Sequence, residues 1–176
     1  MKSIKSIVTL FVLTVAFTTV SCDNEPVDPA LDLSSSSSVT GTYFMTAFNS
    51  SIPTDLNGDG VSSTNQMNET NCFNGSYITL NANNTFVANS KGLDINSNGS
   101  SSTIECFDDG TFSGTWVLSG NRLSITYMDQ GVEYTDEAVL SGNTIVSTYQ
   151  NGEVVGTTSS GEPVYLTSNL QIIFTK

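Results

Sequence analysis

Apolar and polar residues alternate most clearly between Phe112 and Tyr149. Every second residue from Phe112 to Leu118 is apolar or glycine, and the pattern resumes at Leu123, after Gly120-Asn121. Alternation with a period of two, interrupted by glycine and asparagine turns, predicts antiparallel strands with one buried face. This stretch predicts an architecture, and it contains no arrangement of residues that indicates a reaction.

The same pattern predicts strands along most of the remaining chain. A first strand is expected at residues 39–48, with Met45 and Ala47 on one face and Phe48 on the other. A polar insertion follows at 49–74, and then come the expected strands and turns: a hairpin at 76–90, a short strand at 103–107 ended by Asp108-Asp109-Gly110, turns at Gly131, Gly142-Asn143 and Asn151-Gly152, and a last strand at 164–174. About eight strands with turns roughly every 8 to 12 residues predict an all-β fold, either a barrel or a β-sandwich.

The first residues have a different composition. Lys2 and Lys5 precede an apolar run at residues 7–17, which is shorter than the roughly 20 residues that a membrane-spanning helix needs. This pattern is typical of a signal peptide, here residues 1–21. Residues 22–38 contain acids, two prolines and a serine run, which predict a flexible tether, and residues 39–176 form the predicted domain.

Cys22 directly follows small residues at the expected cleavage site, which resembles the bacterial lipobox, with Thr19 where leucine is usual. The resemblance implies that Cys22 is diacylated and holds the protein at the bacterial cell envelope, on the outer membrane. An ordinary secretory peptide with a nearby cysteine is the alternative. Asp23 and Glu25 resemble signals that route some lipoproteins to the cell surface, although a solvated linker explains them equally well.

Charge and composition exclude several functions. The net charge of −12 repels nucleic acid and anionic lipid head groups, so nucleic-acid binding is excluded and membrane attachment depends on the acyl chains. The chain contains no histidine, which removes the Ser-His-Asp and Cys-His arrangements. We therefore expect a protein that is not an enzyme.

The order of motifs after residue 39 resembles the lipocalin-like domains of small bacterial lipoproteins. Gly41-Thr42-Tyr43 stands where that family tends to carry Gly-x-Trp, and Asp109-Gly110-Thr111-Phe112 and Gly114-Thr115-Trp116 follow in order. The resemblance implies an antiparallel up-and-down barrel that binds a small apolar molecule. Independently, Cys72 and Cys106 are an even pair in an exported chain, which predicts a structural disulfide.

The segment from Asp55 to Gly60 has the spacing of a calcium loop. Asp55, Asn57 and Asp59 would supply side-chain oxygens, and Val61 a backbone carbonyl. The twelfth position is glutamine instead of glutamate, so Glu69 would have to complete the site. A structural calcium ion is thus predicted here, and a chance polar loop is the alternative. A second run begins at Asp94 and ends at Glu105 with similar spacing.

Aromatic residues leave two functions open. Eight-stranded barrels either fill with side chains or hold one small ligand. In the first case the aromatics pack a core, and the protein is a surface module that contacts another protein or a glycan. In the second case the protein is a carrier or sensor of a small apolar ligand, and the residues expected to line its cavity are Trp116, Tyr127, Tyr134, Tyr149 and Phe174.

Overall fold

Strands form where apolar and polar residues alternate, and they continue further than the pattern predicts. The computed structural model describes residues 39–98 and 102–176, so the predicted signal peptide, Cys22 and the tether lie outside the described residues. The described elements are β1 (Gly41–Thr54), β2 (Ser63–Asn65), the 3-10 helix η1 (Gln66–Asn68), β3 (Tyr77–Leu80), β4 (Thr85–Ser97), β5 (Ser102–Ser119), β6 (Arg122–Asp129), β7 (Val132–Ser141), β8 (Thr144–Thr157) and β9 (Pro163–Thr175).

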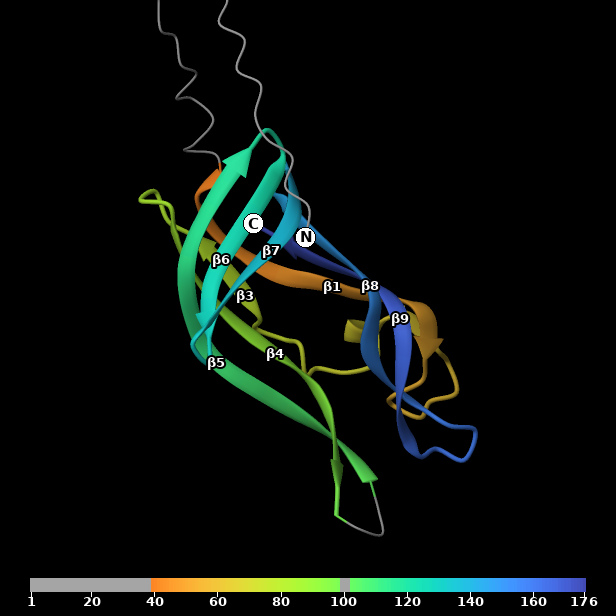
Figure 1. Cartoon of the computed structure of the whole chain (residues 1–176). Helices are drawn as coiled ribbons and strands as arrows, with labels where there is room; N and C mark the ends of the chain where they lie inside the picture. Colours follow the sequence, from red (N-terminus) through yellow and green to blue (C-terminus); the bar gives the residue numbers. More distant parts are fainter. Residues whose placement is uncertain (1–38, 99–101) are drawn as a thin grey trace, which may run out of the picture. The chain divides into compact units, whose positions relative to one another are not determined.

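These strands form a closed antiparallel barrel (Figure 1). Strand β1 pairs with β3 through residues 41–44 and with β9 through residues 44–50, which joins the two ends of the sheet. The remaining neighbours follow chain order from β3 to β9, and β2 pairs only with the far part of β1. The predicted up-and-down barrel is confirmed, and the alternative of an open sandwich is excluded because β1 bonds to β9.

One end of the barrel is filled with side chains. Tyr43 is completely buried, and its hydroxyl donates a hydrogen bond to the Val39 carbonyl oxygen at 2.7 Å. Trp116 is buried in the same cluster, where its indole nitrogen donates to the Asn81 carbonyl oxygen at 3.1 Å. Leucine, isoleucine and phenylalanine side chains of the inward-facing positions complete this core: Leu80, Phe86, Leu123, Leu140 and Ile145.

A bulge in β1 corrects the predicted faces of the first strand. Met45 pairs with Phe174, but the next pair along is Ala47 with Ile173, so Thr46 is an extra residue without its own partner. Because a one-residue shift exchanges the two faces of a strand, Phe48 now pairs with Ile172 and turns inward. Its ring stacks on Phe73 at 4.6 Å between centroids. The expectation that Met45 and Phe48 lie on opposite faces was wrong.

Two predicted turns are also bulges. Residues 109 and 110 of β5 lie opposite Ser90 alone, and Gly110 has φ of +75°, so β5 continues through Asp108-Asp109-Gly110 instead of ending there. Residues 150 and 151 form a similar irregularity inside β8, where Asn151 has φ of +56°. The turns at Gly131 and Gly142-Asn143 do separate strands, as predicted.

The Cys72–Cys106 disulfide is present, as predicted, and joins the segment before β3 to β5. Within the described ranges, no helix has the length and apolar character needed to cross a membrane.

Candidate ligand-binding cavity

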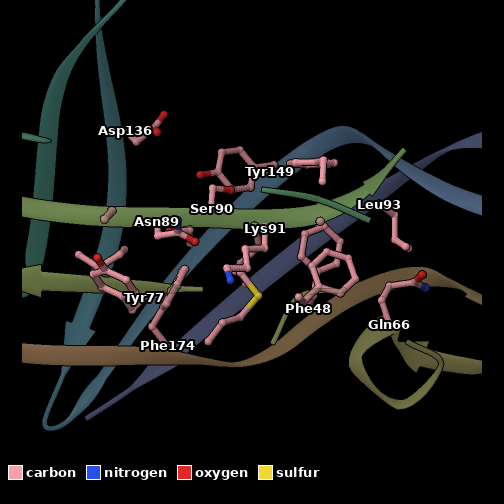
Figure 2. A pocket seen from close by; sticks show the side chains of 18 of the residues that line it. Phe48, Gln66, Tyr77, Asn89, Ser90, Lys91, Leu93, Asp136, Tyr149 and Phe174 are labelled. Carbon is pink, nitrogen blue, oxygen red and sulfur yellow. The ribbon is translucent and has the colours of Figure 1, made fainter. Parts of the chain in front are cut away.

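The other part of the barrel contains a partly open cavity of about 550 Å³. This volume falls in the range of roughly 300 to 1,000 Å³ that is usual for small-molecule sites. The barrel strands β1, β3–β9 and helix η1 all contribute to its lining, and Figure 2 shows part of it around β4. The bulge in β1 matters here, because it places Met45 and Phe48 on the same wall.

Most of the lining is apolar. Rings and aliphatic side chains of inward-facing positions make up this surface, the principal ones being Phe86, Phe112, Ile125, Val154, Ile172 and Phe174. Phe86 packs edge-on against Phe112, and Phe112 contacts Tyr127 with 5.3 Å between ring centroids. A row of rings therefore leads from the packed core into the cavity.

Gln66 forms a polar boundary at one end of the cavity (Figure 2). Its side chain is 1% exposed, and its amide nitrogen donates to Thr54 Oγ1 at 2.7 Å and to Ser50 Oγ at 3.3 Å. The amide oxygen is buried and has no hydrogen-bond partner in the described structure. An unsatisfied buried acceptor costs about 1 to 3 kcal/mol, so this atom is a natural contact point for a ligand.

Charged side chains on β4 and β5 form contacts at the cavity lining and next to it. Lys91 lies 3.2 Å from Asp108 Oδ2, and Asn89 donates its amide N–H to Asp108 Oδ1 at 2.8 Å. The Tyr165 hydroxyl donates to Asp94, a contact that links β9 to β4 although the two strands are not neighbours in the sheet. Together with the Ile95 amide, this hydroxyl holds the pKa of Asp94 below its usual value.

The sequence of the domain matches a known family. The sequence model of the lipocalin-like domain family matches residues 39–147, which is more than half of the chain. The chain belongs to the lipocalin-like domain family. Members of this family are generally binding proteins without catalytic activity, in agreement with a closed barrel that contains a cavity. No curated protein and no solved structure matched the chain.

The lipocalin-like domain places the five predicted lining residues in three settings. Tyr127, Tyr149 and Phe174 line the cavity. Trp116 belongs to the packed core, and Tyr134 is exposed, with its ring stacked on Tyr127 at 5.9 Å between centroids. Neither of these two residues is part of the lining. A ligand role for the other three stays a prediction.

Sequence reasoning missed the polar lining, above all Gln66. Its position was noted only as an imperfect twelfth position of a calcium loop. A single glutamine in a polar insertion carries no local signal that its side chain enters a barrel. One local signal does exist for the position of the helix: Asn65 is a favourable N-cap residue. Its side chain accepts a hydrogen bond from the Met67 amide, and η1 therefore begins at Gln66.

The predicted calcium loop folds around its own backbone. Asp55 accepts hydrogen bonds from the amides of Gly58 and Gly60, both at 2.9 Å, and Asp59 accepts from the Val61 amide at 2.7 Å. Asn57 Oδ1 accepts from the Asp59 amide in the same way, and Glu69 accepts from the Leu56 amide at 3.2 Å. These contacts explain the loop without an ion, and a calcium ion there stays a prediction.

Potential metal ligands are also not gathered elsewhere in the described part of the chain. Among the residues that the structure describes, no group of three or more acidic or cysteine side chains is arranged to hold a metal ion. The run that begins at Asp94 lies in β4 up to Ser97, where Asp94 is the cross-strand partner of Glu105. Residues 99–101 of that run lie outside the described residues. Its predicted loop spacing thus falls largely on a strand.

The environment of Tyr127 makes the stability of the fold depend on pH. Its hydroxyl donates to Asp136 Oδ2 at 3.1 Å, and burial followed by the charge of Asp136 raises the pKa of Tyr127 to about 12 from 10.0. Between these values the folded state holds the proton more tightly than the unfolded state does. The stabilisation is therefore complete below pH 10 and is lost as pH rises toward about 12.

We expect the free energy of unfolding to fall less over this pH window in a Tyr127→Phe variant than in the unmodified protein. Denaturant unfolding at several alkaline pH values measures the difference. Parallel curves for the two proteins would show that Tyr127 titrates normally in the folded state.

Proposed function

We propose that the protein binds a small, mostly apolar molecule in the barrel cavity and performs no chemistry on it. The observation that carries this proposal is the cavity of about 550 Å³, whose lining is largely aromatic and aliphatic with a few polar groups. Sites of this composition bury most of a ligand's apolar surface and use the polar groups to orient it. Membership of a family of binding proteins supports the same function.

We further propose that the protein acts as a carrier or sensor at the bacterial envelope, held at the outer membrane by a lipid on Cys22. The leader at residues 1–21 and the cysteine that follows it support this location. Acyl chains would supply the attachment, since each buried CH₂ contributes about 0.8 kcal/mol. Mass analysis of Cys22 from membranes tests the anchor, and an unmodified thiol there would overturn it.

Filling the cavity should weaken binding. Ala88 is 3% exposed and lines the cavity beside Phe86, so Ala88→Leu places additional carbon atoms in the ligand's space. We expect the affinity of the full chain for a neutral fluorophore, N-phenylnaphthylamine, to fall by about tenfold or more. Fluorescence titration measures this change, and thermal unfolding verifies that the variant is folded.

Ala82→Leu is the matched control, because Ala82 is exposed in the turn between β3 and β4 and does not line the cavity. Equal weakening in both variants, or no binding to the unmodified protein, would reject the cavity as the site. The surface module that contacts a protein or a glycan would then be the better explanation.

A further inference from the structure

We infer that the ligand carries a head group that donates hydrogen bonds and bears no negative charge: a hydroxyl, an amide or an ammonium on an apolar body. This inference rests on the proposed function and specifies its ligand class. It follows from the polar atoms of the cavity lining, in which acceptors and negative charges predominate.

The first acceptor is the side-chain oxygen of Gln66. Ser50 Oγ donates its single proton to the Ile52 carbonyl oxygen at 2.6 Å, so toward Gln66 it can only accept. The amide nitrogen of Gln66 must therefore face Ser50 and Thr54, as observed. This arrangement leaves Oε1 buried and without a partner among the described residues, on a side chain that lines the cavity.

A second acceptor lies on β4. Asn89 donates its side-chain N–H to the carboxylate of Asp108, which at neutral pH can only accept, and this contact fixes the orientation of the amide. Asn89 Oδ1 is then the other buried side-chain atom of the described structure that lacks a partner. Asn89 also lines the cavity, so two separate positions of its wall offer an acceptor to a ligand.

The charged side chains of the lining also disfavour a negatively charged ligand. Asp94, Asp136 and Glu153 contribute carboxylates, whereas Lys91 is the one positively charged side chain among the described lining residues. Its ammonium group is already paired with Asp108 at 3.2 Å. Asp94 and Glu153 are exposed and Asp136 is half-buried, so a ligand carboxylate would meet like charge as it enters the cavity.

Two lining hydroxyls already donate their protons to carboxylates, so they do not offset the excess of acceptors and negative charges. Tyr127 donates its proton to Asp136, and Tyr165 donates its proton to Asp94. A donor head group near Gln66 or Asn89 gains a hydrogen bond that the protein alone does not make. An anionic head group at the same place would set its oxygens against an acceptor.

Three amphiphiles with the same alkyl chain test the inference on the unmodified full chain: dodecylamine, dodecanol and dodecanoate. Competition against N-phenylnaphthylamine gives their relative affinities at neutral pH and below the concentrations at which they form micelles. We expect the amine and the alcohol to bind at least about tenfold more tightly than the carboxylate. Equal or tighter binding of dodecanoate overturns the inference and leaves the proposed function intact, whereas binding of none of the three overturns the proposed function.

A pair of variants tests whether the ligand donates a hydrogen bond to Gln66. Gln66→Met keeps a side chain of similar length and removes the acceptor, and we expect it to reduce the advantage of dodecanol over dodecanoate by about fivefold or more. Gln150→Met is the matched control, since Gln150 is exposed and lies outside the cavity lining. Residues before 39 are identical in all these proteins, so differences between variants report on the cavity.

An unchanged preference in a folded Gln66→Met protein would show that the ligand does not depend on this oxygen, and it would overturn the assignment of Gln66. Thermal unfolding shows whether that variant folds. The comparison of the three amphiphiles needs no variant, and it decides the charge preference if Gln66→Met does not fold.

Discussion

Removing the Cys72–Cys106 disulfide is expected to lower the free energy of unfolding by about 4 kcal/mol. The bond closes a loop with a sequence separation of 34, and in the chain-entropy model a loop of this size restricts the unfolded chain by that amount. Single domains are stable by only about 5 to 15 kcal/mol, so the loss is a large fraction of the total. The segment that the bond ties to β5 also contains Phe73, whose ring packs on Phe48 at the cavity.

The double variant Cys72→Ser/Cys106→Ser avoids a leftover thiol, and denaturant unfolding measures its stability. A reducing agent should destabilise the unmodified protein by a similar amount and leave the double variant unchanged, which separates loss of the bond from the effects of substitution. A loss of less than about 1 kcal/mol would indicate that the unfolded chain is already constrained in this region.

Gly114→Ala is expected to destabilise the barrel by about 3 kcal/mol or more, although alanine usually stabilises a strand relative to glycine. A Cβ at this position would lie 2.0 Å from the Thr126 carbonyl oxygen and 2.8 Å from the Phe86 ring. The nearer obstacle is backbone, which no side-chain rotation can move. Strands β5 and β6 would have to separate around the pair formed by Gly114 and Tyr127.

Ser113→Ala is the control, because its side chain is exposed on the neighbouring position of the same strand. Denaturant unfolding of both variants measures the difference, and we expect the control to stay within about 0.5 kcal/mol of the unmodified protein. A loss of less than about 1 kcal/mol in Gly114→Ala would falsify the close approach of β6 to this residue.

The sequence predicted the barrel because alternation reports which face of a strand is buried. It did not predict the three bulges, since a bulge depends on how many residues each partner strand places in the same interval. Thr46 is the instructive case: nothing in the alternation of residues 39–48 marks it as an extra residue, and the inward position of Phe48 follows from it. The disulfide was predictable because Cys72 and Cys106 are the two cysteines that follow Cys22.

The cavity could be predicted only in part, for a related physical reason. Alternation assigns a residue to the inside of a barrel but does not give its height along the barrel axis. Trp116 and Tyr127 therefore occupy equivalent positions in the alternating pattern, although Trp116 packs in the core and Tyr127 lines the cavity. Gln66 had no signature at all, because its role depends on Ser50 and Thr54, which approach it only when the chain folds back.

The last two strands connect the closure of the barrel to the shape of the cavity. Residues 39–147 match the family, yet Tyr149, Val154, Tyr165 and Phe174 of β8 and β9 also line the cavity. These two strands form one hairpin, in which β9 closes the barrel against β1. The hairpin therefore has two roles, because it closes the barrel against β1 and also contributes side chains to the cavity lining. A substitution that loosens the β1–β9 pairing would thus change the shape of the cavity together with the stability of the barrel.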